Sequence, residues 1–269
     1  MKTKLLMLLL IGIMLLSGCV NQQPMTTTTS STSTSTSMGT TTSTRKTTTT
    51  TISNETAKGE YNPIINPANF VAKIDNQYYS LVPGTTFIYQ GEADGETEKN
   101  EVYVTHQTKN VLGVITTVIR DRVFDADNEL TEETFDWYAQ DRNGDVWYFG
   151  EDSKEYEGGV VVSTEGSWEA SVDGAKPGII MKANPKVGDS WKQEYYKDVA
   201  EDQAEVLGLN ESISVPYGSF KDCIKTRDWT PLQPDIEENK YYCPNTGVVL
   251  TVMVKGGSEQ MELIDITTE

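Results

Sequence analysis

Three cysteines are the residues whose type and position most clearly indicate chemistry in this sequence. Cys19 follows a Leu-Ser-Gly tripeptide, the small-residue setting in which an exported lipoprotein carries a lipid on its cysteine thiol. Cys223 and Cys243 remain as a pair, and an exported protein meets an oxidising compartment in which such a pair forms a disulfide. Two buried free thiols are the alternative for this pair.

An acidic turn is the best candidate for metal chemistry. Asp141, Asn143 and Asp145 alternate along an Asp-Arg-Asn-Gly-Asp segment, and Asp152 follows further on, so their oxygens could converge on a hard cation such as calcium. A calcium-binding EF-hand loop would have glycine at Val146 and a bidentate glutamate at Asp152. The favoured interpretation is therefore a hairpin turn built on the Asn-Gly pair, and we predict no metal and no cofactor.

Catalytic patterns are scarce in this sequence. His106 is the sole histidine, and there is no Gly-x-Ser-x-Gly motif, no His-x-x-Glu-His type spacing and no phosphate-cradling glycine loop. We interpret His106 as a structural residue at the end of a strand. Two carboxylates suffice for glycan hydrolysis, and 40 acidic residues cannot be searched by spacing alone. We expect no enzyme, with a glycan-acting hydrolase that uses paired carboxylates as the alternative.

The start of the chain predicts where the protein works. Lys2 and Lys4 precede an apolar run at 5–16 that is too short to span a bilayer comfortably. A positive start, a short apolar core and a small-residue break are typical of a signal peptide, here 1–18. The mature chain would begin at Cys19, held by its lipid at the outer face of the cell membrane and exposed to the exterior.

Residues 19–59 are predicted to be a disordered, lipid-anchored stalk. Positions 26–51 are almost entirely Thr and Ser, a composition that cannot bury enough apolar surface to fold and that suits O-glycosylation. Asn54 and Asn210 each begin an Asn-x-Ser/Thr sequon, which fits a glycosylated, exported protein.

Charge limits the partners of the mature protein. Loss of the two signal lysines takes the formal charge from −18 to about −20. Nucleic acid and anionic lipid surfaces both require clustered Lys and Arg, so neither is an expected partner. The lipid on Cys19 would be the link to the membrane, and the function would belong to the part from 60 to 269.

That part resembles itself at a shift of 103 to 105 residues. Pro-Gly-Thr-Thr-Phe at 83–87 falls on Val-Gly-Asp-Ser-Trp at 187–191, and further matches follow in order. We predict two repeats, at about 81–169 and 185–267, the alternative being two β-hairpins with similar turn chemistry.

Each repeat is expected to supply five or six strands, rich in β-branched and aromatic residues and separated by turns such as Asp-Gly and Asn-Gly. Those of the first repeat are predicted near 85–91, 99–107, 114–124, 132–140, 145–150 and 159–168. The fold class is then all-β, with two tandem antiparallel β-meander units that form a barrel or half-barrel. A curved sheet of this kind packs its own core or holds an apolar ligand.

The two later cysteines fit one hairpin of the second repeat. Residues 220–230 and 237–243 read as strands, with a proline-rich turn between them. Cys223 and Cys243 would face each other across this hairpin, and closing the loop would stabilise the fold by roughly 3 kcal/mol.

Three segments of the second repeat resemble a pattern of secreted bacterial and archaeal proteins. They are Val-Pro-Tyr-Gly-Ser-Phe at 215–220, Cys-Ile-Lys at 223–225 and Tyr-Tyr-Cys-Pro-Asn-Thr-Gly-Val-Val at 241–249. That family has a Val-Pro-Ala-Gly-Thr-Phe strand opening and a later Tyr-Tyr-Ala-Pro-Gly-Val-Gly turn, so Tyr217 and the Asn-Thr pair depart from it. The resemblance covers about 81–266 and implies an all-β, exported protein with no known catalytic residue. The stalk resembles archaeal surface lipoproteins more than bacterial ones.

Localisation and the scarcity of catalytic motifs together favour a non-catalytic module. We expect a cell-surface binding or structural protein whose partner is a small apolar ligand in the curved sheet, a glycan or a surface protein. Adjacent aromatic residues such as Trp137 and Tyr138 would place one ring on each face of the sheet. They are expected to pack the core, and a sugar-binding platform is the alternative.

Overall fold

The computed structural model describes residues 61–93 and 95–269, and in them the chain folds almost entirely into β-strands. The predicted signal peptide and stalk, with Cys19 and Asn54, lie outside the described residues. The elements in chain order are η1 (Pro67–Asn69, a 3-10 turn), β1 (Phe70–Val71), β2 (Ile74–Asn76), β3 (Tyr79–Leu81), β4 (Thr85–Ala93), β5 (Glu96–Val111), β6 (Val114–Phe124), β7 (Leu130–Asp141), β8 (Val146–Glu157), β9 (Val160–Ser163), β10 (Trp168–Glu169), β11 (Lys176–Met181), β12 (Ser190–Lys192), β13 (Glu194–Tyr195), β14 (Gln203–Val215), β15 (Gly218–Trp229), β16 (Glu237–Cys243), β17 (Gly247–Lys255) and β18 (Gln260–Thr268).

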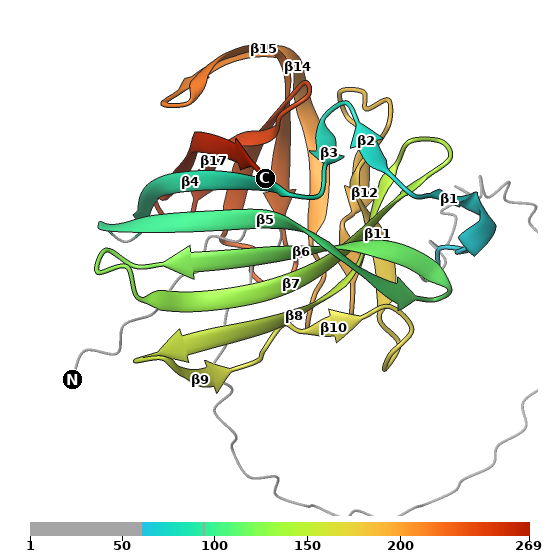
Figure 1. Ribbon diagram of the computed structural model, residues 1–269. Helices are drawn as coiled ribbons and strands as arrows, with labels where there is room; N and C mark the ends of the chain where they lie inside the picture. The colour runs from blue at the N-terminus through green and yellow to red at the C-terminus, as the bar shows by residue number, and fades with distance from the viewer. Residues whose placement is uncertain (1–60, 94) are drawn as a thin grey trace, which may run out of the picture. The chain divides into compact units, whose positions relative to one another are not determined.

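Antiparallel pairing joins most of these strands into one 16-stranded sheet. Its main path runs β12-β14-β15-β16-β17-β18-β4-β5-β6-β7-β8-β11-β13. The last strand, β18, pairs with the first long strand, β4, and β11 near one end of the path contacts β12 at the other end. The sheet therefore curls into a nearly closed barrel, which Figure 1 shows with β4 to β8 crossing β14 and β15 at a steep angle.

The predicted all-β class is confirmed, but two tandem units are not. Strands β4 to β8, and again β12 with β14 to β18, follow one another as antiparallel neighbours, as the internal repeat requires. The pairing of β18 with β4 makes both halves part of the same sheet, and residues 62–269 form one compact unit. The halves share one interior, so neither has a core of its own.

Glycines explain where the predicted strand bounds differ from the observed ones. Strand β6 lies where it was predicted, but β8 continues to Glu157 because Gly158 and Gly159, with φ of 56° and 77°, make the next turn. These positive angles are readily adopted by glycine and suit a tight two-residue hairpin. The single strand expected at 159–168 is divided into β9 and β10.

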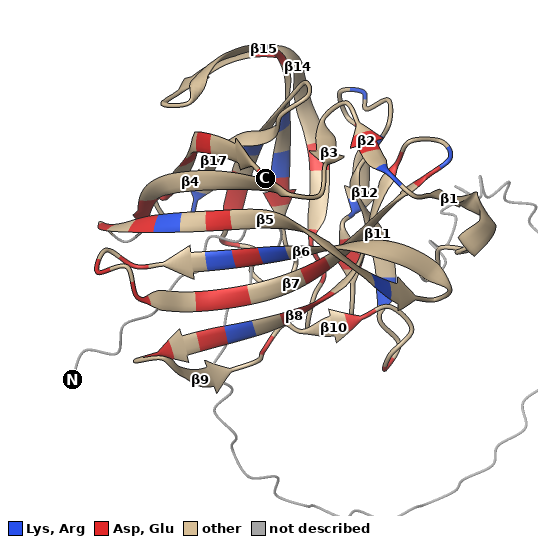
Figure 2. Ribbon diagram, in the orientation of Figure 1, with Lys and Arg blue, Asp and Glu red and all other residues tan. Residues whose placement is uncertain are grey.

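Strands β5 to β7 carry charges of both signs, coloured as red and blue bands along the ribbon in Figure 2, and several of them form ion pairs on the outward face. Glu101 of β5 accepts from Arg122 of β6 at 2.6 Å and lies 3.0 Å from Lys99. Arg120 pairs with Glu133 of β7. Because one face of the sheet meets water and the other meets the interior, period-two alternation separates these ion pairs from the core.

A small hairpin, β2–β3, packs against the barrel and ties distant strands together. The ring of Tyr79 lies 5.6 Å from that of Tyr138 on β7 and 6.4 Å from that of Tyr242 on β16. The side-chain amide of Asn76 donates to the carbonyls of Gly144 (2.8 Å) and Lys182 (3.2 Å). The hairpin thus links the β7–β8 turn, the segment after β11 and the second half of the barrel.

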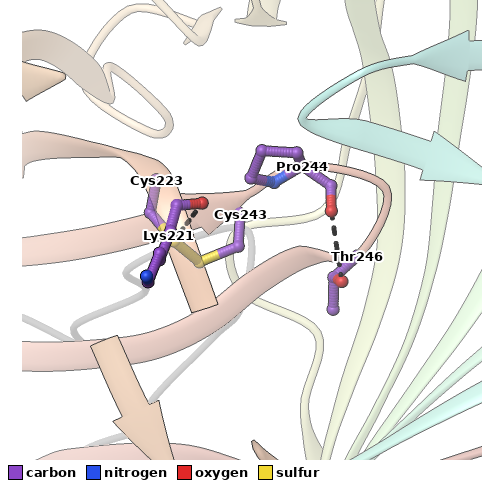
Figure 3. The surroundings of a disulfide bond; sticks show 5 residues. All are labelled: Lys221, Cys223, Cys243, Pro244 and Thr246. Atoms are coloured by element: carbon purple, nitrogen blue, oxygen red, sulfur yellow. Dashed lines mark hydrogen bonds between the residues drawn. A yellow bond between two sulfur atoms is a disulfide. The ribbon is translucent and has the colours of Figure 1, made fainter. Parts of the chain in front are cut away.

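The predicted disulfide is confirmed. Cys223 of β15 and Cys243 at the end of β16 are bonded, with Cα atoms 4.2 Å apart, beside the strand pair Ile224 and Tyr242 (Figure 3). Both sulfurs are fully buried. Strand β16 ends at this bond, whereas the β14–β15 hairpin continues past it and is held to β18 by a hydrogen bond from Tyr217 N to Leu263 O (3.1 Å).

The Cys223→Ala/Cys243→Ala variant should lose about 3 kcal/mol of unfolding free energy, because the bond closes a loop of 20 residues in the unfolded chain. Urea unfolding of the oxidised protein measures the loss. Wild-type protein unfolded under reducing conditions is the control, since it lacks the bond but keeps both side chains. A loss below 1 kcal/mol in both samples would contradict the assignment of this bond as a main support of the hairpin.

Candidate functional site

Among the buried acidic side chains, five come from β6, β7, β8 and β13 and are each at most 5% exposed. We call this set the buried carboxyl cluster: Asp121 of β6, Glu132 and Asp136 of β7, Glu151 of β8 and Glu194 of β13. Asp136 stands opposite Glu151 in the β7–β8 pairing, and Asp121 stands opposite Thr134 in the β6–β7 pairing. Because residues two apart share a face of a strand, the register of three neighbouring strands brings the carboxyls to one region.

The hydroxyl of Tyr148 joins two members of the cluster. It lies 2.7 Å from Asp136 Oδ1 and 3.2 Å from Glu151 Oε2. A hydroxyl has one proton to donate, so the second hydrogen bond forms only when one carboxyl carries a proton and donates it to the phenol oxygen. The geometry therefore requires a neutral acid at this point. Both carboxyl oxygens lie within 3.2 Å of one atom, so they can be no more than about 6 Å apart.

Burial raises the pKa of every member of the cluster. Removal from water raises the pKa of Asp121 to about 7, with partial relief from the amide of Asn100. Burial, with a further contribution from Asp121, raises the pKa of Asp136 to about 8. The pKa values of the three glutamates also lie well above the usual range, again because of burial first.

Glu194 is the member with the weakest hydrogen bonding. Neither of its carboxyl oxygens has a partner in hydrogen-bonding geometry within the described residues, although the backbone of Asp202 and the Trp168 side chain are near enough to ease its raised pKa. Glu151 Oε1 and Glu132 Oε2 also have no partner among those residues. An unpaired buried carboxylate would be costly, so these groups are most stable as neutral acids.

A separate buried group on β15 and β16 is charged. Lys240 Nζ lies 3.6 Å from Asp228 and 3.7 Å from Glu238, and Gln193 donates to Asp228 at 3.0 Å. Burial lowers the pKa of Lys240, but the two neighbouring carboxylates outweigh burial and leave it raised. This lysine is thus paired and charged, and it does not neutralise the carboxyl cluster on β6 to β8.

Two carboxyls whose oxygens are no more than about 6 Å apart are compatible with the spacing of retaining glycosidases, the hydrolase alternative. In such an enzyme both carboxyls must meet the substrate. Here Asp136 is 5% and Glu151 1% exposed, and Tyr148 covers both from within the core. The paired carboxyls are present, but the arrangement is that of a packed interior.

Asp141, Asn143 and Asp145, the candidate metal ligands, form a turn. Asp141 accepts hydrogen bonds from the backbone of Asn143 (2.8 Å) and Asp145 (3.1 Å), and Asp145 accepts from the backbone of Ala183 (2.7 Å). Asp152 lies apart from them on β8, where it pairs with Lys154. Within residues 61–93 and 95–269, no three His, Cys, Asp or Glu side chains are placed to hold a metal ion.

Two further residues singled out in the sequence, Asn210 and His106, are both exposed. Asn210 is exposed on the projecting part of β14, with φ of 64°, so its sequon is accessible, and its glycosylation stays a prediction. His106 is exposed on β5, 3.7 Å from Glu269.

An open groove of about 430 Å³ lies between the β1–β2 segment and the β7–β8 turn. We call it the polar groove. Its polar lining comes from Lys73, Asp75, Gln140, Asp141, Arg142 and Asn143. This volume is within the range of small-molecule sites.

Hydrogen bonds hold the groove in shape. Gln140 accepts from the backbone of Asp75 (2.9 Å) and donates to its carboxylate (2.8 Å). Arg142 donates through its backbone to Asn69 O (2.7 Å) and through Nε to Ala68 O (3.0 Å). The two carboxylates of the lining are engaged within the fold, whereas Lys73 and the end of the Arg142 guanidinium face the open side without a partner among the described residues.

Comparisons with known proteins identify no family. A scan of protein-family models and a search of the curated proteins find no match. Among solved structures, a protein of Bacteroides fragilis provisionally described as exported, with a YmcC-like fold, has a TM-score of 0.44 and 16% identity over 72% of this chain and 100% of its own. A chain of Parabacteroides distasonis provisionally described as a lipoprotein has a TM-score of 0.41 and 12% identity over 71% and 99%.

These likenesses are too distant to carry an argument about function. Both organisms are bacteria, so they do not support the archaeal origin expected from the stalk. Because no family model matches, the resemblance to the secreted Val-Pro-Ala-Gly-Thr-Phe family stays a prediction.

Sequence reasoning missed the buried carboxyl cluster and the polar groove. The only signal for the cluster was the period-two series Glu132, Thr134, Asp136 and Tyr138, but the alternate residues Glu133, Phe135 and Trp137 are as mixed in character. Such a strand does not reveal which face is buried. The groove joins segments about 70 residues apart and has no local signature.

The buried carboxyl cluster should make the protein less stable as pH rises. Below about pH 4 these carboxyls are protonated in both states, and above it the unfolded chain loses protons that the folded chain keeps. Stability should thus fall from about pH 4 until the folded pKa values, about 7 for Asp121 and about 8 for Asp136, are passed. Asp136→Asn should flatten the decline by up to about 1.4 kcal/mol per pH unit.

Urea unfolding at pH 4 to 8 measures this decline, with the exposed Asp235→Asn as the matched control. Stability that stays level or rises between pH 5 and 7 would show that the interior carboxyls are not neutral in the folded protein.

Calcium should leave the melting temperature unchanged, because the Asp141 carboxylate is already occupied by the turn. Asp141→Ala should cost about 1–2 kcal/mol of stability through its lost hydrogen bonds, equally in calcium and in chelator. Thermal unfolding measures both effects. A calcium-dependent rise in melting temperature that Asp141→Ala abolishes would show that this turn binds the metal.

Proposed function

We propose that this protein is a cell-surface, lipid-anchored, non-catalytic binding module, and that the polar groove takes an acidic glycan. The observation that carries this proposal is where the described structure has room for a ligand. The groove of about 430 Å³ lies beside the β7–β8 turn and presents two exposed cationic side chains, Lys73 and Arg142, whereas the apolar hollow beside β3 to β5 has about 30 Å³.

An apolar ligand inside the curved sheet fits the structure less well. The apolar hollow between β3, β4, β5 and the start of β17 has a volume of about 30 Å³, which is about the volume of one water molecule. Beyond it the interior holds the acidic members of the buried carboxyl cluster. A lipid tail would need more room and a less polar lining, so the proposed ligand is polar.

The charges of the groove favour a ligand with an acidic group. Asp75 and Asp141 accept hydrogen bonds from Gln140, Asn143 and the turn, so part of their accepting capacity is used within the fold. Arg142 can offer its terminal nitrogens to a carboxylate or sulfate in bidentate fashion, with Lys73 as a second cation. Sugar hydroxyls would meet the amides that remain in the lining.

The hydrolase alternative requires the Asp136 and Glu151 carboxyls to reach a sugar. The burial of these carboxyls argues against a hydrolase, and the cluster is accounted for as part of the folded interior. A role in which the glycan is held and not cleaved needs only the groove.

Localisation rests on the start of the sequence. The signal, Cys19 and the Thr-rich stalk support display beyond the membrane, where glycans of the cell or its neighbours are met. No helix in residues 61–93 and 95–269 is long and apolar enough to cross a bilayer.

Titration calorimetry of the full chain in detergent with a hexuronic-acid oligosaccharide and its neutral parent tests the proposal. Arg142→Gln and Lys73→Gln should each weaken binding of the acidic sugar at least tenfold, whereas Lys197→Gln, which removes an exposed cation elsewhere, should not. Mass spectrometry of the recovered sugar should find it intact. Equal losses in all three variants would assign binding to net charge, and a cleaved sugar would favour the hydrolase.

A further inference from the structure

Strand β9 is an edge strand with exposed valines. Within the described residues it pairs with β8 alone, and Figure 1 shows it at the margin of the barrel. Val160, Val161 and Val162 are 64%, 44% and 52% exposed. Because successive side chains point to opposite faces, exposure of all three means that neither face of β9 is covered by the barrel.

The turn before β9 makes this edge a preformed strand. Glu157 pairs with Val160 around Gly158 and Gly159, whose φ values of 56° and 77° suit a type I′ turn. A Cβ at either glycine would meet nothing within 4 Å. The turn therefore requires glycine for its positive φ angles and not for lack of space. The hairpin therefore presents its outer edge in extended form before any partner arrives.

Within residues 61–93 and 95–269, the edge has none of the usual protection against pairing. Edge strands are commonly guarded by lysine, by proline or by a covering segment. Strand β9 contains no lysine and no proline. The two ends of the main sheet differ from β9, because β11 and β12 contact each other there. Three consecutive exposed β-branched residues on a bare edge are a template for an added strand.

Charge around the edge selects among the possible occupants. Glu155 and Glu157 lie on β8 beside it and Glu165 follows it, close enough that the last two add to the raised pKa of Glu155, after its partial burial. A second copy paired through β9 would add only a second set of the same three acids, about three strand spacings (~14 Å) from the first, and no opposite charge. An added strand that carries Lys or Arg would lie roughly 10 Å from β8, where its long side chains can reach the acids across β9.

We propose that β9 is a docking edge, and that it takes an extended segment of a partner protein in which apolar, β-branched residues alternate with Lys or Arg. Backbone hydrogen bonds to β9 would supply the pairing, the valines would supply apolar contact and the three acids would select the charge. The edge is independent of the polar groove, so it offers a second point of attachment on the same module.

The test measures binding of a synthetic peptide to the full chain in detergent by fluorescence anisotropy. The peptide has blocked ends, and valine alternates with lysine along it. The same peptide with N-methylated central amides keeps the charge but cannot pair, and should bind at least tenfold more weakly. Val161→Lys should also weaken binding at least tenfold, because it adds a like charge and guards the edge. The matched control, Val254→Lys, changes a valine of similar exposure on β17, which has strands on both sides, and should bind within twofold of wild type.

Val161→Pro, which removes one backbone donor, is a second blocking variant, and its unfolding free energy is measured to confirm that it folds. Equal binding of the N-methylated peptide, or equal binding by Val161→Lys, would overturn strand addition. Equal binding of a glutamate version of the peptide would overturn the charge selection. A dimer of the free protein that Val161→Lys abolishes would make a second copy the occupant and would refute the proposal as stated.

Discussion

The pairing of β18 with β4 is the constraint on which the rest of the structure depends. It runs from Gln260 opposite Glu92 to Thr268 opposite Thr85, and it joins the end of the chain to the first long strand. The two backbones approach so closely that a Cβ on Gly91 would lie 1.8 Å from Gln260 O, which no side chain could accept. Closure across this seam converts a long meander into a barrel with an inside, and every buried group owes its environment to that step.

The enclosed interior explains why acids there are neutral. On an open sheet, Asp136 and Glu151 would meet water and ionise, whereas in the barrel they share the hydroxyl of Tyr148 and burial raises the pKa of both. Lys240 is buried too, but it has carboxylates of its own on β15 and β16. The barrel thus separates an ion-paired region from an acid-only region, and the acid-only region is the part whose stability depends on pH.

The two proposed recognition sites lie on the outside of the barrel. The polar groove is lined by the turn residues that were the candidates for a metal site. The Asp141 carboxylate accepts hydrogen bonds within the turn, and Arg142 lines the groove. Strand β9 offers backbone and valines at a different place. The proposed acidic ligand and the proposed partner segment would therefore bind at two separate places, and neither would enter the core.

The sequence alone determined the elements whose signals are local. Strand-like runs between turn residues predicted β6 and β16 at their observed bounds, and two cysteines that face each other across one hairpin predicted the disulfide. Tertiary structure decided what depends on distant residues: the closure of β18 on β4, which strand faces are buried, and the groove that joins Lys73 to Arg142. The physical reason is that both faces of strands such as β7 carry polar and apolar residues, so only the register across the closed sheet settles which carboxyls leave water.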